Sequence, residues 1–122
     1  MILNSNLPRV CELARKAERV LDVGGWRHGL NLATHVLDIE PYTKMRHDPL
    51  DPENAPRVTP ETWLVHDACK APWPYPDKYF DFSFCSHLLE DVRDPLTVCA
   101  ELVRVSRSGY GAYRCEAFGP PA

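Results

Sequence analysis

Short apolar runs recur along this chain, and each contains or directly precedes an acidic residue. Three of them cover Val20–Val23, Thr34–Ile39 and Trp63–His66, and a fourth, rich in aromatic residues, covers Tyr79–Cys85. Near-continuous apolar runs of this length are typical of parallel strands that are covered on both faces. The pattern therefore predicts an α/β fold with an open, mainly parallel sheet.

A helix is predicted after the aromatic run. Asp94 can cap its free backbone amides, and Pro95 suits the first helical position. Arg104 and Arg107 fall in the expected last turn, where cations are favoured, and Gly109 is expected to cap the carboxyl end before a fifth strand at about 110–113. The apolar residues assigned to the buried face of this helix are Leu96, Cys99, Leu102 and Val103.

The connections between the other strands are unusual. Residues 25–33 leave room for barely one helical turn, whereas a crossover between parallel strands normally needs a dozen or more residues. The first crossover helix is therefore expected to be missing or vestigial. Residues 8–18 can form a short helix before the first strand. Residues 41–62 contain several prolines and are predicted to be a surface loop that either closes over a ligand or only connects the strands.

The first apolar run leads directly into Gly24 and Gly25. Because glycine has no Cβ atom, it can adopt positive φ and lets a ligand approach the backbone. Asp22 lies inside the same run, and an unpaired buried charge is costly, so we expect its carboxylate to bind loop amides or a ligand. The alternative is a tight turn that Asp22 only ties down.

Asp22, Asp38 and Asp67 each lie near the carboxyl end of a predicted strand. Ligands of open α/β sheets bind beyond these ends, so the three side chains are expected to converge there. Asp38 is placed to accept hydrogen bonds from two ribose hydroxyls, and a turn or helix cap is its alternative role. A dinucleotide site needs G-x-G-x-x-G opening a full helix, and residues 24–29 read GGWRHG, so NAD is disfavoured.

Composition and charge narrow the function further. The 122 residues suffice for a single domain over 1–122 with one core. The net charge of −3 is spread over interspersed acidic and basic residues, which argues against partners such as nucleic acid or an anionic membrane. No apolar run approaches the ~20 residues of a membrane helix, and the first residues do not resemble a signal peptide, so a cytoplasmic location is expected. The five cysteines and five histidines show no metal-ligand spacing, so no metal site is predicted.

Residues 72–110 resemble the central signature of class I S-adenosylmethionine-dependent methyltransferases of the type 11 kind. The similarity rests on a Pro-rich turn at residues 72–78, Phe-Asp opening the fourth strand, and the motifs HLLE, DP and ELVRV before a glycine. The run VLDVGG resembles the first motif of the same family. This resemblance implies a Rossmann-like sheet with strand order 3-2-1-4-5 and S-adenosylmethionine as cofactor.

The resemblance also implies roles for individual residues. The acidic residue ending the second strand, Asp38, would bind the ribose, and Asp67 would hold the adenine amino group. The first loop would pack against the methionine part, and the end of the fourth strand would border the same pocket. The implied cofactor-binding residues are Asp22, Gly24, Gly25, Asp38, Ile39, Asp67, Ala68, Cys85, Ser86 and His87.

Two departures from the family pattern stand out. Trp26 and His28 occupy positions where the family commonly has small residues, and the family fold continues beyond a fifth strand, so we expect a C-terminally shortened domain. His87 and Glu90 could act as a general base, but loop support and helix capping are the stronger interpretations, and no catalytic residue is assigned.

The expected function is an S-adenosylmethionine-dependent methyltransferase with a small-molecule or carbohydrate-like acceptor. The alternative is a non-catalytic binding module that acts through a homodimer or a protein partner at the edge of the fifth strand.

Overall fold

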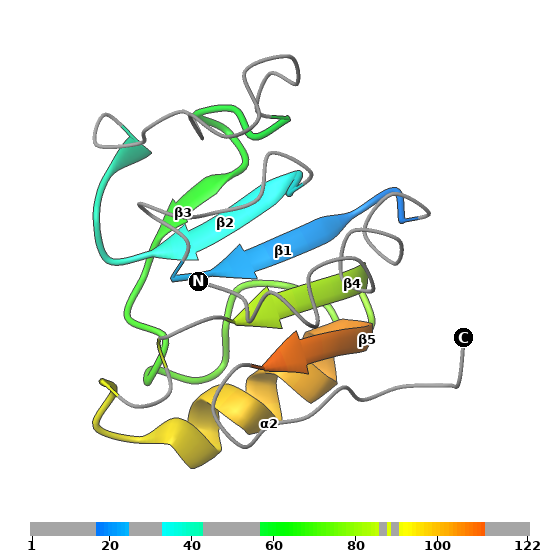
Figure 1. Ribbon diagram of the computed structural model, residues 1–122. Coiled ribbons are helices and arrows are strands. Elements are labelled where there is room, and N and C mark those ends of the chain that lie inside the picture. The colour runs from blue at the N-terminus through cyan, green and yellow to red at the C-terminus, as the bar shows by residue number, and fades with distance from the viewer. Residues whose placement is uncertain (1–16, 25–32, 43–56, 86–87, 89–90, 112–122) are drawn as a thin grey trace, which may run out of the picture.

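The computed structural model describes residues 17–24, 33–42, 57–85, 88 and 91–111. Within these ranges, five parallel strands form one sheet in the order β3-β2-β1-β4-β5 (Figure 1). The order confirms the one expected from the sequence. The elements are β1 (Val20–Val23), β2 (His35–Asp38), β3 (Trp63–Val65), β4 (Phe80–Cys85), α2 (Pro95–Val105) and β5 (Ser106–Gly111).

The strand register aligns the carboxyl ends at one edge of the sheet. Val23, the last residue of β1, lies opposite Leu37 of β2 and Cys85 of β4. Asp38 at the end of β2 lies opposite Val65 at the end of β3. The loops that leave these strands therefore start side by side.

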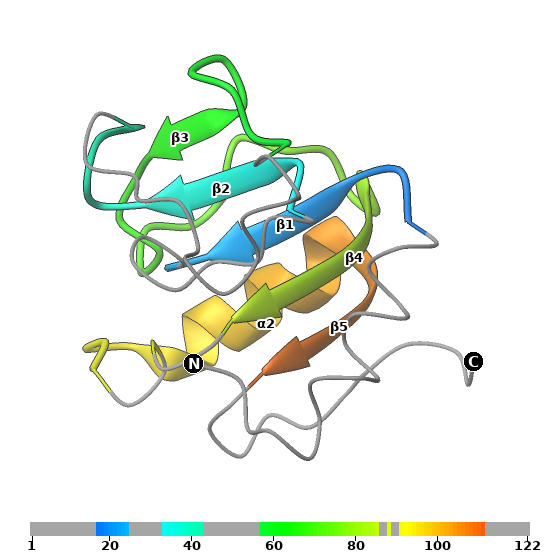
Figure 2. The ribbon, with the colours of Figure 1, turned by 45° about the horizontal axis from the view of Figure 1, so that its top comes forward.

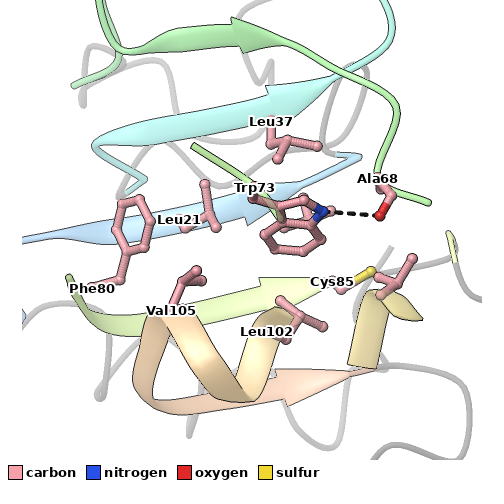
Figure 3. Close-up of a cluster of buried hydrophobic side chains, with 10 residues drawn as sticks. Leu21, Leu37, Ala68, Trp73, Phe80, Cys85, Leu102 and Val105 are labelled. Atoms are coloured by element: carbon pink, nitrogen blue, oxygen red, sulfur yellow. Dashed lines mark hydrogen bonds between the residues drawn. The ribbon is translucent and has the colours of Figure 1, made fainter. Parts of the chain in front are cut away.

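Helix α2 connects β4 to β5 and covers one face of the sheet (Figure 2). Trp73 is the largest side chain in the core between them and is only 1% exposed. Its indole Nε1 donates a hydrogen bond to the backbone oxygen of Ala68 at 2.9 Å (Figure 3). The buried residues of this cluster are Leu21, Val23, Leu37, Ala68, Trp73, Phe80, Cys85, Val98, Leu102 and Val105.

The buried face of α2 was predicted correctly only in part. Leu102 is buried and Cys99 packs against the core cluster, as expected, but the other two predicted residues do not lie in the core. Leu96 is 81% exposed and Val103 is 47% exposed, whereas Val98, Leu102 and Val105 are buried. Both sets have helical spacing, so the apolar pattern alone cannot decide which face meets the sheet. The start of the helix was predicted correctly, because the Asp94 carboxylate accepts a hydrogen bond from the Thr97 amide at 3.2 Å.

The predicted end of α2 was also wrong. The helix ends at Val105, and β5 begins at once with Ser106, so Arg107 and Gly109 belong to the strand. The last carbonyls are capped by Lys78, whose Nζ donates to the Val103 oxygen at 2.7 Å and to the Ser106 oxygen at 3.1 Å. A cation from a preceding turn thus replaces the expected glycine cap.

Arg104 joins the last turn of α2 to the Pro-rich turn before β4. Its guanidinium donates to the backbone oxygens of Trp73 and Tyr75, both at 2.9 Å. It also pairs with the nearly buried carboxylate of Glu101 at 2.7 Å and with the exposed carboxylate of Asp77 at 2.8 Å. The Pro-rich turn is therefore fixed to the helix by a charged group that is largely shielded from water.

The surface loop predicted at residues 41–62 is described only at its two ends. The Tyr42 ring meets the Trp63 ring edge-on at 5.9 Å between centroids, and Val58 packs in a small cluster with Val36 and Trp63. Three segments lie outside the described residues: 43–56, then 25–32, which is most of the first crossover, and 1–16, which includes most of the helix predicted at 8–18. Across the described ranges, no helix is long and apolar enough to cross a membrane.

Candidate functional site

The candidate site lies at the carboxyl edge of β1, β2, β3 and β4. Two backbone hydrogen bonds fix the chain there. The Gly24 amide donates to the Leu37 oxygen at 2.9 Å, and the His66 amide donates to the Asp38 oxygen at 2.9 Å. The structure therefore brings the predicted positions at the ends of the first three strands to one edge, in neighbouring loops.

Gly24 occupies a position that only glycine suits. Its φ is +72°, in the left-handed region, and a Cβ atom built there would lie 3.2 Å from three side-chain atoms of Leu88. A side chain at this position would therefore suffer both backbone strain and a close contact. Gly25 lies outside the described residues.

Asp22 is buried in the sheet, with 2% of its surface exposed. Its neighbours Leu21 and Val23 belong to the cluster beneath α2, so the Asp22 side chain lies on the opposite face, because side chains alternate along a strand. Its Oδ2 has no hydrogen-bond partner among the described residues. Burial, and next the charge of Asp38, raise the pKa of Asp22 to about 8.

Asp38 is nearly buried at the end of β2, with 6% of its surface exposed. Its Oδ1 accepts a hydrogen bond from the Glu40 amide at 2.9 Å, which is the turn-capping role named above as the alternative. Ile39 follows it with 73% of its surface exposed, so an apolar side chain stands open to solvent directly beside this carboxylate. An exposed aliphatic group next to a carboxylate can contact the flat face of a nucleoside base while the carboxylate accepts hydrogen bonds.

Asp67 follows β3 in a short turn. Its Oδ1 accepts a hydrogen bond from the Cys69 amide at 2.9 Å, and its Oδ2 lies 3.6 Å from Nη2 of Arg93. Both side chains of this ion pair are partly or largely exposed, so its strength is low. The adjacent Ala68 is buried, and its carbonyl oxygen is used by Trp73.

Cys85 ends β4 with its side chain fully buried in the core cluster beneath α2. It therefore borders the edge mainly through its backbone, opposite Val23. Ser86, His87 and Glu90 lie outside the part of the chain that the structure describes.

The sequence interpretation missed two residues at this edge. Leu88 packs over Gly24, and Arg93 reaches the carboxylate of Asp67. Arg93 directly precedes the recognisable Asp-Pro helix start, which was the available signal. Leu88 belongs to the HLLE motif quoted above, but nothing in that local pattern indicates that this apolar residue packs on the loop after β1.

Comparison with known proteins gives two findings. A family model described as a methyltransferase domain matches residues 27–111. A solved structure of a SAM-dependent methyltransferase from Thermotoga maritima, described as a possible histamine N-methyltransferase, is similar with a TM-score of 0.55 and 22% sequence identity. The alignment covers 88% of this chain and 48% of that one, so the chain spans about half the length of that protein, and the likeness shows a common fold. No match was found among curated proteins.

Proposed function

Because the chain belongs to the methyltransferase domain family, we propose that it binds S-adenosylmethionine and transfers the methyl group to a small-molecule or carbohydrate-like acceptor. The observation that carries this proposal is the buried Asp22 carboxyl, whose Oδ2 lacks a partner among the described residues beside the Gly24 turn. A buried polar atom without a partner is costly in an isolated fold, and a ligand donor would satisfy it.

The residues at the edge fit this cofactor in chemical type. Asp38 offers a carboxylate to the ribose hydroxyls, and the exposed Ile39 offers an apolar surface to the adenine ring. Asp67 offers carboxylate oxygens to the adenine amino group, in competition with Arg93. We assign Asp22 and the Gly24 backbone to the amino-acid tail of the cofactor, because the Asp22 Oδ2 has no hydrogen-bond partner among the described residues.

When bound, the cofactor supplies a methyl group that is already activated by a positively charged sulfur. The contribution of this chain is therefore mainly to hold both reactants in line and to exclude water. Asp38 and Ile39 would fix the nucleoside, and Asp22 would orient the tail by accepting a hydrogen bond. No described side chain is assigned as a catalytic residue.

Titration calorimetry tests the proposal directly. The purified protein is titrated with S-adenosylmethionine, S-adenosylhomocysteine and, as a control, NAD. Binding of both adenosyl ligands and no binding of NAD is expected, because the Gly24 turn lacks the dinucleotide fingerprint. A folded protein that binds neither adenosyl ligand would refute the proposal.

The free edge of β5 supports a second candidate function. Among the described residues β5 pairs with β4 alone, and an unpaired strand edge is a template for pairing with another chain. The corresponding proposal is a binding module that works with a second copy or a protein partner at this edge. Light scattering and a methyl-transfer assay separate the two functions, because the module predicts ligand binding by an oligomer without turnover.

A further inference from the structure

Asp22 and Asp38 lie on the same face of the sheet. Asp22 is opposite Val36 in the register of β1 and β2, and Asp38 follows two residues later on the same side of β2. Both are buried, with 2% and 6% of their surfaces exposed. Two carboxyl groups held close together away from water do not both ionise easily, because each charge disfavours the other.

The described side chains next to Asp22 do not compensate a negative charge. Its partner in β4 is Phe84, and the apolar residue Leu88 packs beside Gly24, two positions further along the chain. Among the described residues, no basic side chain forms an ion pair with Asp22. The charge of Asp38 adds to burial in raising the pKa of Asp22, and the positive charge of the N-terminus opposes them with a smaller effect. In the free site, a negative charge on Asp22 would therefore lie beside a second carboxyl group and apolar side chains.

We propose that Asp22 carries a proton in the free protein and releases it to solvent when a ligand bearing an ammonium group binds at the strand ends. The proton lost by the Asp22 carboxyl leaves a carboxylate that pairs with the ligand's ammonium group, so charge and protons balance. This coupling rests on the proposed function, since the amino-acid tail of the adenosyl cofactor supplies the ammonium group.

The coupling makes ligand affinity depend on pH. The pKa of Asp22 is raised to about 8, so below that pH the ligand must displace a proton. Affinity is expected to rise by up to about tenfold for each unit of pH and to level off above about pH 8.

The same group gives the free protein a matching pH dependence of stability. Its folded pKa of about 8 lies above the ordinary value of 3.8, so the folded state holds the proton more tightly than the unfolded chain. The stability contribution is full below the ordinary value and is lost as pH rises towards about 8. An asparagine at this position cannot ionise, so it should remove this trend.

The test is calorimetric titration with S-adenosylhomocysteine, which has the same amino-acid tail and does not react. Wild type and Asp22→Asn are compared between about pH 6 and pH 8, in buffers with different ionisation enthalpies so that released protons are counted. Glu61→Gln, the same carboxyl-to-amide change in an exposed turn, is the control. Thermal unfolding of the free proteins over the same pH range is the second readout.

The expected result is an affinity that rises with pH and a net proton release in wild type and Glu61→Gln, and a weaker, flat affinity without release in Asp22→Asn. Wild-type binding without proton release, or equal release in Asp22→Asn, overturns the coupling and leaves the proposed function standing. Failure of the folded wild type to bind at any pH overturns both. If Asp22→Asn does not fold, proton release by wild type alone decides, and its absence overturns the coupling.

Discussion

Replacement of Gly24 by alanine tests the local geometry of the site most directly. The residue has φ of +72°, and the added methyl group would lie 3.2 Å from the Cβ, Cδ1 and Cδ2 atoms of Leu88. The left-handed backbone costs a non-glycine residue roughly 1–2 kcal/mol. Overpacking against Leu88 adds about 1–3 kcal/mol, because carbon atoms prefer separations of about 3.5–4.0 Å.

The two costs are partly offset in the unfolded state. Alanine restricts the unfolded chain more than glycine does, which returns about 0.4–1 kcal/mol. The expected net loss is therefore about 2–4 kcal/mol of unfolding free energy. In a Leu88→Ala background two of the three close contacts are gone, so Gly24→Ala should cost only about 1 kcal/mol there.

Urea denaturation of the four proteins in this double-mutant cycle measures both quantities. A coupling energy of about 1 kcal/mol or more between the two positions is expected. The reasoning is refuted if Gly24→Ala is as stable as wild type. An equal cost in both backgrounds would assign the whole effect to the backbone and remove Leu88 from the explanation.

Three further predictions concern single side chains. Asp38→Ala should weaken binding of S-adenosylhomocysteine by about 1–3 kcal/mol in calorimetry, and unchanged affinity in a folded variant would exclude Asp38 from the site. Arg104→Ala should lower the unfolding free energy by about 3 kcal/mol, because it leaves the carboxylate of Glu101 buried without its cation. Asp77→Asn is the matched control and should change stability by less than about 1 kcal/mol in urea, since Asp77 is exposed. Burial, and next the charge of Arg19, lower the pKa of His35 below its ordinary value of 6.5. The unfolded chain therefore takes up this proton first, and stability is lost as pH falls through about 6.5 towards the folded pKa. The difference in melting temperature between wild type and His35→Gln should change over that range, and a constant difference would contradict this reasoning.

The strands could be predicted because the necessary signals are local, whereas their order followed from the resemblance to the methyltransferase family. Each run is short, rich in apolar residues and bounded by polar ones, and the near-continuous run Val20–Val23 is typical of a covered parallel strand. The positions of Asp22, Asp38 and Asp67 at the strand ends followed from the same runs. The rule that parallel strands share one carboxyl edge then brought them together.

The orientation and the end of α2 could not be predicted, because distant residues determine them. Two apolar sets with helical spacing, one containing Leu96 and one containing Val98, compete for the same sheet. The choice depends on contacts with the Pro-rich turn, of which Arg104 makes three. The helix ends where Lys78 from that turn caps the backbone carbonyls. The sequence of the helix itself therefore does not predict where it ends.

The hydrogen bonds made by Arg104 and Lys78 affect local unfolding of the domain. Arg104 holds the carbonyls of the Pro-rich turn, and Lys78 holds the junction between α2 and β5. These bonds join the Pro-rich turn, α2 and the start of β5, so the described residues in 73–85 and 91–106 should exchange their amide hydrogens together. The loop ends at Gly24 and Asp38 hold none of these bonds. At the ligand edge the chain is held instead by the backbone hydrogen bonds from Gly24 to Leu37 and from His66 to Asp38, so amide exchange there should not follow that of the segment that Arg104 and Lys78 join.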